Sequence, residues 1–233
     1  KKKIYIMAQS ILIIADSGMG KSTSVRKLDP KETFIINVAG KGLPFKGWKK
    51  NYQNIKGNPK GNITSASSAK GILKALDHVN ENMEHIKNIV IDDFQYMAAF
   101  EYFDRTGEKG YDKFSDIATN IAAVAKRPKD MREDLMVFYL THSEEVSVSK
   151  GAVKIKAKTV GKMIDNALTL EGLYTVVLFG KVIKQDDGSF QYGFETQTDG
   201  DNTCKSPDGM FEELFIPNCL QYVRDHIIEY END

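Results

Sequence analysis

The feature that constrains this chain most is a glycine-rich segment placed between an apolar run and a helical pattern. The segment reads ADSGMGKST and covers residues 15–23. The apolar run before it ends at Ile14 and predicts a buried strand, while a helix is expected from Gly20 to about Leu28, before Asp29-Pro30. A buried strand that passes through glycines into a helix is typical of an α/β fold with a parallel sheet.

The same segment has the composition of a triphosphate-binding loop. We expect Gly18 and Gly20 to let the backbone curve around phosphates, and Lys21 to reach the β and γ phosphates. The Ser22 hydroxyl is expected to bind Mg²⁺, so the predicted cofactors are ATP and Mg²⁺. The predicted nucleotide-binding residues are Asp16, Ser17, Gly18, Met19, Gly20, Lys21, Ser22 and Thr23.

One position departs from the pattern G-x-x-x-x-G-K-[ST] of such loops. Ala15 stands where the first glycine belongs. Alanine is the smallest residue with a side chain, so the turn is expected to survive as long as the φ angle of Ala15 stays negative.

An acidic pair follows a second apolar run, Ile89-Val90-Ile91. Asp92 is the predicted second Mg²⁺ ligand beside Ser22, and Asp93 is the candidate that orients or deprotonates the attacking water. Two alternatives stay open: Asp93 as the N-cap of the following helical pattern, and Glu101 as the base.

His142 follows another buried run, Leu135 to Leu140. A polar residue at the tip of such a strand can contact the γ-phosphate, so His142 is the candidate sensor. The alternative is an ordinary polar residue at a strand end. The predicted catalytic residues are therefore Lys21, Asp92, Asp93 and His142.

Strand and helix patterns alternate through most of the chain, which predicts a mostly parallel sheet flanked by helices. Further strands are expected at 33–38, 88–92 and 135–141, and helices at 68–86, 113–126 and 218–230. Segments 174–183 and 190–197, joined through Asp187-Gly188, predict an antiparallel hairpin. We expect one domain over 1–233, with a core at about 1–170 and an antiparallel extension with a closing helix at about 171–233.

Composition narrows the classes of partner. Lys plus Arg and Asp plus Glu each total 32, so the net charge is zero and any nucleic-acid contact needs a local patch. Cys204 and Cys219 are expected to be two reduced thiols. The longest apolar stretch is too short to cross a bilayer, so no membrane partner is expected and the predicted location is cytoplasmic.

Several segments resemble phage-encoded RecA-like ATPases of the Sak-type single-strand annealing group, an AAA family of ATP-binding proteins. They are ADSGMGKST, TFIINVAGKGLPFKGW, NIVIDDFQYM, FYLTHSE, KTVGKMIDNALTLEG and TDGDNTCKSPDGMF, spread from Ala15 to Phe211. The resemblance implies a RecA-like P-loop NTPase core that hydrolyses ATP, forms a homo-oligomeric ring or filament and binds single-stranded DNA. It implies a role in phage recombination or replication in the bacterial cytoplasm, and it leaves open a single-strand DNA-binding protein as a partner.

RecA-type cores carry two DNA-binding loops, and two segments match them. Residues 104–111 match the first loop, with Arg105 and Lys109 as candidate contacts. Residues 144–158 match the second, and their alternate lysines would lie on one side of an extended segment. The candidates there are Lys150, Lys154, Lys156 and Lys158. Tyr111 and Phe114 are candidates for stacking on bases, and the alternative for the whole segment is a solvated lysine-rich loop.

Other basic residues are candidates for two further roles. ATP at a subunit interface of a RecA-like assembly needs a cation from the neighbouring subunit, and the candidates are Lys158, Lys162 and Lys205. A second basic group surrounds Trp48 and consists of Lys41, Lys46, Lys49 and Lys50, for which a solvated patch is the simpler interpretation.

The leading hypothesis is a DNA-stimulated ATPase that assembles on single strands and promotes annealing or strand exchange. One alternative is an ATP-gated DNA-binding loader with little hydrolysis. Another is a P-loop kinase for a nucleotide or small molecule, which the scattered arginines disfavour because such kinases use an arginine-rich lid. The arginines are Arg26, Arg105, Arg127, Arg132 and Arg224.

Overall fold

The computed structural model describes residues 8–147, 153–160 and 168–232. The predictions for Lys150 and Lys162 lie outside these residues. The strands are β1 (Gln9–Ile14), β2 (Thr33–Asn37), β3 (Ile63–Ser65), β4 (Asn88–Asp92), β5 (Met136–Thr141), β6 (Ser143–Ser147), β7 (Val153–Ala157), β8 (Val176–Lys184), β9 (Phe190–Glu195) and β10 (Phe215–Pro217). The helices are η1 (Ser22–Lys27), α1 (Trp48–Asn51), α2 (Ala69–Asn82), α3 (Gln95–Asp104), α4 (Asp112–Lys126), η2 (Arg127–Asp130), η4 (Leu170–Leu173) and α6 (Leu220–Asn232), where η denotes 3₁₀ helices.

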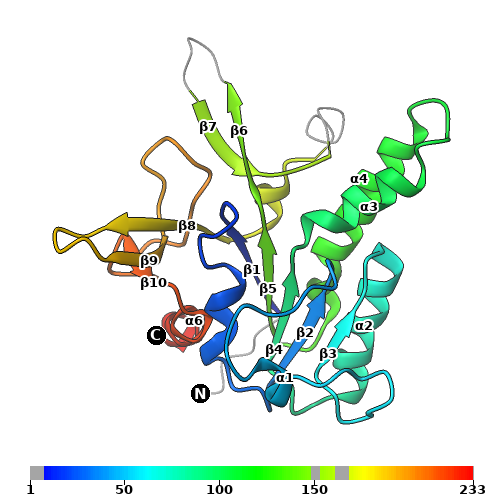
Figure 1. Cartoon of the computed structure of the whole chain (residues 1–233), viewed down its shortest axis with the longest axis horizontal. Coiled ribbons are helices and arrows are strands. Elements are labelled where there is room, and N and C mark those ends of the chain that lie inside the picture. Colours follow the sequence, from blue (N-terminus) through cyan, green and yellow to red (C-terminus); the bar gives the residue numbers. More distant parts are fainter. Residues whose placement is uncertain (1–7, 148–152, 161–167, 233) are drawn as a thin grey trace.

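The strands form an eight-stranded sheet in the order β10-β9-β8-β1-β5-β4-β2-β3. Strands β8, β1, β5, β4, β2 and β3 run parallel to their neighbours, and β9 and β10 add antiparallel pairs. Figure 1 shows this sheet with helices beside it. The predicted α/β class with a mostly parallel sheet is therefore confirmed.

The predicted hairpin of β8 and β9 is also present, but it is not appended to the core. β8 pairs in parallel with β1, with Ile11 opposite Val176 and Ile14 opposite Phe179. The outer half of β8 continues beyond β1 as the hairpin with β9. β8 thus belongs both to the central sheet and to the hairpin. Its pairing with β1, the strand before the glycine-rich loop, fixes the position of the hairpin.

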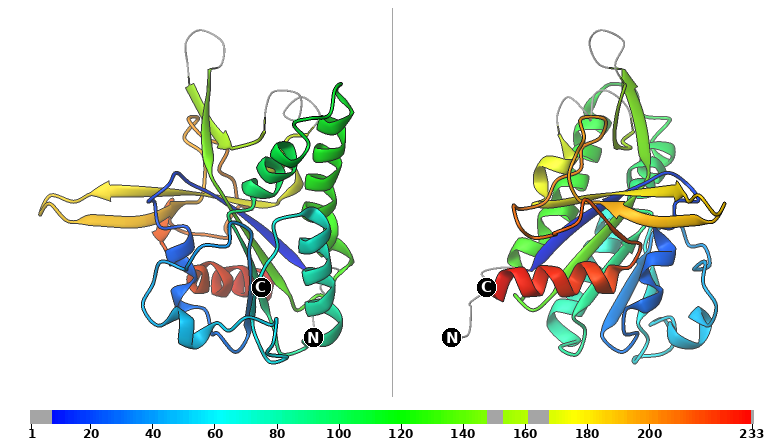
Figure 2. Two further views of the ribbon diagram at one scale, coloured as in Figure 1. Left: turned by 45° about the vertical axis from the view of Figure 1, so that its right-hand side comes forward. Right: turned by 90° about the vertical axis from the view of Figure 1, so that its left-hand side faces the viewer.

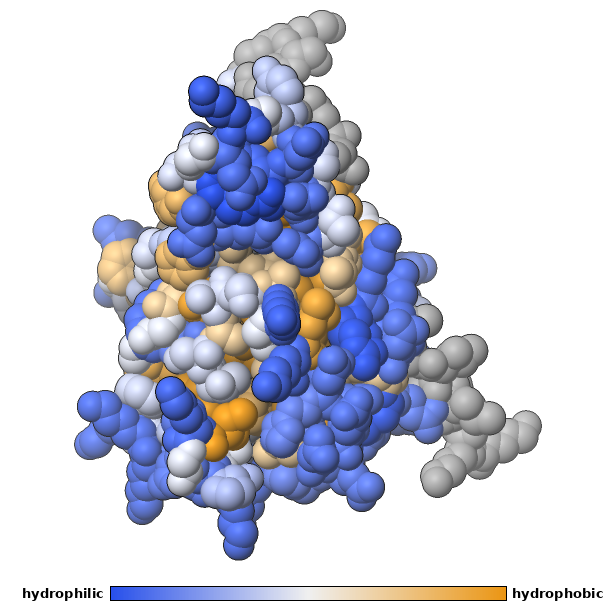
Figure 3. Space-filling model, turned by 90° about the vertical axis from the view of Figure 1, so that its right-hand side faces the viewer, coloured by the Kyte–Doolittle hydropathy of each residue, from blue (hydrophilic) through white to orange (hydrophobic). Residues whose placement is uncertain are grey.

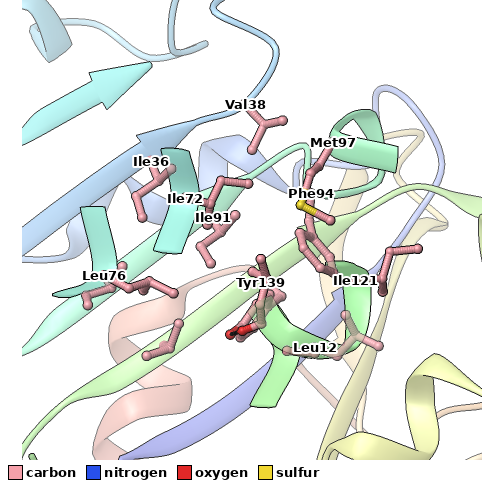
Figure 4. Close-up of a cluster of buried hydrophobic side chains, with 14 of the residues drawn as sticks. Leu12, Ile36, Val38, Ile72, Leu76, Ile91, Phe94, Met97, Ile121 and Tyr139 are labelled. Atoms are coloured by element: carbon pink, nitrogen blue, oxygen red, sulfur yellow. Dashed lines mark hydrogen bonds between the residues drawn. The ribbon is translucent and has the colours of Figure 1, made fainter. Parts of the chain in front are cut away.

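Each face of the sheet carries its own apolar core. One core contains side chains from α2, α3 and α4, including Ile72, Leu76, Met97 and Ile121, as Figure 4 shows. The other contains Val25 of η1 and Val223 and Ile227 of α6. All residues of β4 and β5 are buried because helices cover both faces, which explains why these strands are continuous apolar runs in the sequence.

The helix after the glycine-rich loop is shorter and tighter than predicted. It is the 3₁₀ helix η1 and not an α-helix from Gly20 to Leu28. Its six residues include Ser22, Thr23, Ser24 and Val25, which are weak helix formers, and the Ser24 hydroxyl donates to the Lys21 carbonyl oxygen at 2.5 Å. Such a short segment before Asp29-Pro30 has no room for extended α-helical hydrogen bonding.

The described parts of the segment expected as the second DNA-binding loop form an antiparallel hairpin of two strands. β6 and β7 pair from Ser143 opposite Ala157 to Ser147 opposite Val153. This hairpin continues from the end of β5 and projects from the sheet at the top of Figures 1 and 2. Apolar Ile155 packs against the core, and the β-branched residues between the lysines favour strands over a loop.

Two further expectations concern the whole chain. Within the described ranges, none of the helices combines the length and apolar character that a membrane span requires. Cys204 and Cys219 are both buried free thiols, as predicted.

Candidate nucleotide site

The glycine-rich loop has the backbone conformation that its composition predicts. Gly18 and Gly20 both have a φ of +84°, a region that glycine enters freely. The loop connects β1 to η1 at the carboxyl end of the parallel strands. A side chain at position 20 would also meet Asn218, whose Nδ2 lies 3.0 Å from the place of a Cβ atom.

Ala15, the one departure from the loop pattern, is accommodated by a glycine on a neighbouring strand. Among described residues other than glycine, only Asp93 has a positive φ, so Ala15 keeps the negative φ that an L-residue needs. A Cβ added to Gly180 of β8 would lie 2.7 Å from the Cβ of Ala15. Because Gly180 has no side chain, it leaves the space that the Ala15 methyl group occupies.

We expect Gly180→Ala to destabilise the protein by about 1–3 kcal/mol, because two Cβ atoms would compete for one space. The double variant Ala15→Gly with Gly180→Ala is expected to recover most of this loss. Urea unfolding measures both effects, and Gly172→Ala, whose Cβ would lie 3.9 Å from Thr169, is the matched control. A double variant no more stable than Gly180→Ala would show that the Ala15 contact is not the cause.

Lys21 is held inside the loop by backbone oxygens. Its Nζ donates to the Ala15 carbonyl oxygen at 2.6 Å and to the Asp16 carbonyl oxygen at 2.8 Å. The side chain is only 6% exposed, and burial lowers its pKa to about 8. The ammonium is thus positioned and largely desolvated, which strengthens its interaction with an incoming anion.

Ser22 and Asp92 meet although they are far apart in the chain. The Ser22 hydroxyl donates to Asp92 Oδ1 at 2.7 Å. Asp92 Oδ2 is buried and has no hydrogen-bond partner among the described residues. Burial, with a contribution from Asp93, raises the pKa of Asp92 to about 6. A hydroxyl and a carboxylate oxygen without a partner make a suitable pair of ligands for a hard divalent cation that phosphates also coordinate.

Asp93 lies between Lys41 and His142. Its carboxylate is 2.5 Å from Lys41 Nζ and 3.4 Å from His142 Nε2. Burial would raise the pKa of Asp93, but the contacts with His142 and Lys41 outweigh burial and lower it. Burial would lower the pKa of Lys41, but the contact with the Asp93 carboxylate outweighs burial. The pKa of Lys41 is therefore raised.

One open cleft of about 870 Å³ is lined by Lys21, Ser22, Lys41, Asp93 and His142. Its floor is the glycine-rich loop, and Lys41, Asp93 and His142 stand on one side. The other side is formed by residues 190–192 of β9 and by residues 217–219 just before α6. The cleft is large enough for a nucleotide.

No protein-family model matches the sequence, and no curated protein matches it significantly.

The cleft brings together most of the predicted catalytic and nucleotide-binding residues. Lys21, Ser22, Asp93 and His142 all line it, and Asp92 contacts it through Ser22. Asp16 lies near the start of the loop, and its carboxylate accepts a hydrogen bond from the Ser143 hydroxyl at the start of β6.

The two alternatives for the acidic residues do not agree with the geometry. α3 begins at Gln95 with Phe94 as its N-cap and no side-chain capping bond, so Asp93 does not cap it. Asp93 instead has a φ of +61°, a left-handed conformation that Asp tolerates better than most residues. Glu101 accepts hydrogen bonds from Arg105 and Asn120, and it does not line the cleft.

The predicted DNA-binding residues that the structure describes do not line the cleft and belong to two projections, the outer end of α3 and α4 and the β6–β7 hairpin. Arg105 forms ion pairs with Glu101, Glu108 and Asp116 at 3.2, 2.7 and 2.8 Å, which disfavours its predicted role as a phosphate contact. Lys109 is exposed at the same outer end of α3 and α4. Figure 3 shows that hydrophilic side chains cover this end.

On the other projection, Lys154 and Lys156 share a face of β7, as predicted. Lys156 lies 3.3 Å from Glu144, and Lys158 is exposed just after the strand.

The remaining candidates have mixed surroundings. Lys205 is exposed, and its backbone bridges to Val177 of β8 away from the cleft. Tyr111 is 71% exposed, whereas Phe114 packs against Tyr102.

The cleft also contains residues that sequence patterns did not identify as part of it. The sequence places Lys41 with the basic residues around Trp48, whereas in the structure it faces Asp93. The available signal was its place between Gly40 and Gly42, just after a strand, where a parallel sheet binds ligands. Asn218 carries no local signal, because its contact with Gly20 depends on how the C-terminal segment folds back.

Proposed function

We propose that this chain is an ATP-binding, Mg²⁺-dependent ATPase with a RecA-like core, which assembles on single-stranded DNA as a ring or filament and promotes annealing or strand exchange. The observation that carries the nucleotide part is the contact between Ser22 and Asp92 beside the buried ammonium of Lys21. It joins the two segments that a P-loop ATPase needs at one metal site. The DNA part rests on the sequence resemblance and on the basic hairpin beside the site.

Mg²⁺ fits the residues that would hold it, Ser22 and Asp92. The buried Asp92 Oδ2 has no partner among the described residues, and a cation would supply one. One carboxylate, one hydroxyl and the phosphates of the nucleotide would hold the ion. When bound, Mg²⁺ neutralises phosphate charge and polarises the phosphoryl group that is transferred.

Lys21, Asp93 and His142 have distinct expected tasks. Lys21 binds the β and γ phosphates with the donor that Ala15 and Asp16 leave free. Asp93 orients the attacking water, provided that Lys41 moves away from the Asp93 carboxylate. His142, which contacts Asp93, would sense whether the γ-phosphate is present.

The tip of β5 offers a direct route from nucleotide to DNA. β5 lies between β1 and β4, so its end is next to both the glycine-rich loop and the acidic pair. His142 contacts Asp93, and the next residue, Ser143, bonds Asp16 and begins β6. A change at the phosphates would therefore act on the β6–β7 hairpin, which carries Lys154 and Lys156.

We expect replacement of Lys154, Lys156 and Lys158 by glutamine to weaken single-strand binding and to flatten its salt dependence. Each lost phosphate contact lowers the slope of log K against log salt by about 0.7, so the three together lower it by up to about two units. Fluorescence anisotropy with a labelled oligonucleotide measures the slope. The matched control replaces three exposed lysines around Trp48, namely Lys46, Lys49 and Lys50. A changed slope only in the control would move the DNA site to the Trp48 side.

One observation favours the second candidate, an ATP-gated DNA binder with little hydrolysis. Lys41 and His142 occupy the Asp93 carboxylate and lower its pKa, which makes it a weaker base. A kinase is disfavoured because Arg26 is the one arginine of the five that lines the cleft, whereas Arg105, Arg127 and Arg132 bind carboxylates or carbonyl oxygens elsewhere.

The test is ATP hydrolysis across a titration of single-stranded DNA, with light scattering recorded on the same samples. Turnover and particle size that rise together support the proposal. Size that rises while turnover stays flat supports the ATP-gated binder. No response of either quantity would overturn the DNA part and favour the kinase.

A further inference from the structure

The cleft extends well beyond the part that a triphosphate needs. From the glycine-rich loop it continues to residues 190–192 of β9. In Figure 2 the β8–β9 hairpin extends past the other strands of the sheet, above η1 and α6. A surface of β9 therefore faces the same space as Lys21.

That surface is aromatic and continuous with the core. Phe190, Tyr192 and Phe194 alternate along β9, so their side chains share one face of the strand. Phe194 is fully buried in the core between the sheet and α6, whereas Tyr192 and Phe190 are 46% and 63% exposed. Two aromatic rings thus extend the core outward along the wall of the cleft, where the structure leaves them largely uncovered.

A polar side chain without a partner lies between the aromatic pair and the loop. Asn218 is 6% exposed, and its Nδ2 has no hydrogen-bond partner among the described residues. The backbone amide of Asn218 donates to the Tyr192 carbonyl oxygen at 3.2 Å, and its side chain packs against the Gly20 position. A buried amide without a partner is costly, so it points to a ligand group at this place.

We infer that Tyr192 and Phe190 form the stacking surface for the base of a nucleoside triphosphate, with Asn218 binding its ribose between base and phosphates. The inference rests on the proposed nucleotide function and names where that ligand's nucleoside binds. Aromatic rings stack on bases, and a purine offers more stacking area than a pyrimidine. The order along the cleft is phosphate at Lys21, ribose at Asn218 and base at Tyr192.

The test separates the base from the phosphates by comparing ATP, CTP and inorganic tripolyphosphate, each with Mg²⁺, in isothermal titration calorimetry. We expect ATP to bind about ten-fold or more tighter than tripolyphosphate, with CTP between them. Tyr192→Ala and Phe190→Ala are expected to bring ATP close to tripolyphosphate and to leave tripolyphosphate unchanged. Tyr192→Phe is expected to retain ATP affinity, because the ring and not the hydroxyl carries the contact.

Phe103→Ala is the matched control, since Phe103 is an exposed aromatic residue outside the cleft. Equal losses for ATP and tripolyphosphate in Tyr192→Ala would overturn the inference in favour of a structural role. Unchanged ATP affinity would overturn it too, and a changed particle size in the same variant would then assign the aromatic pair to contact between copies of the chain. If wild-type protein binds neither ATP nor tripolyphosphate, the proposed function itself fails.

Discussion

Lys21→Ala is expected to reduce ATP affinity by about 100-fold or more. The variant removes a nearly buried ammonium, which is 6% exposed and is held by two carbonyl oxygens of the loop. Loss of one partner from a desolvated charge pair costs about 3–5 kcal/mol. Because binding is expected to order the loop around the phosphates, nucleotide-dependent assembly on DNA is expected to disappear as well.

Isothermal titration calorimetry with ATP and Mg²⁺ measures this loss. Lys27→Ala is the matched control, because Lys27 is an exposed lysine on the rim of the same cleft and is expected to change affinity only a few-fold. Unchanged ATP affinity in Lys21→Ala would show that the glycine-rich loop is not part of the nucleotide site. Circular dichroism and urea unfolding would establish that the variant is folded.

Asp92→Asn is expected to lower Mg²⁺-dependent ATP hydrolysis by about 100-fold or more without lowering stability. The carboxylate is the predicted metal ligand, and an amide of the same shape cannot replace its charge. Asp208→Asn, at an exposed aspartate, is the control for hydrolysis. Hydrolysis at the wild-type rate in Asp92→Asn would show that Asp92 does not take part in the reaction.

The pH dependence of stability provides a second readout for Asp92. Its pKa of about 6 lies above the ordinary value of 3.8, so the folded protein retains a proton there that the unfolded chain releases. Above pH 6 the buried carboxylate is charged and lowers the stability of the metal-free wild type, and this cost is relieved as the pH falls through 6 towards 3.8. Asp92→Asn has no such group.

The advantage of the variant in free energy of unfolding is therefore expected to be largest at pH 8 and to shrink at pH 5. Urea unfolding of both proteins at the two pH values measures it. An advantage that grows as the pH falls would mean that the Asp92 carboxyl is not destabilised by burial.

Several elements were predictable because their determinants are local. β4 has the predicted bounds, Asn88 to Asp92. A short apolar run between polar ends is typical of a strand in a sheet that is covered on both faces. α2 was predictable from its apolar period and is capped by Ser68, whose hydroxyl accepts from the Gly71 amide. The β6–β7 hairpin was missed because the family resemblance placed a DNA-binding loop at residues 144–158, whereas Ile155 anchors the hairpin to the core.

Local sequence patterns are enough to predict the glycine-rich loop, Lys21, the acidic pair and the parallel class of the sheet. These follow from residues adjacent in the chain, where glycine conformation, strand period and charge act over a few positions. The folded chain is needed to show that Gly180 makes room for Ala15, that Lys41 pairs with Asp93, and that Asn218 and Tyr192 border the cleft. Each of these contacts joins segments that the order of strands in the sheet brings together. That order cannot be predicted from a local sequence pattern.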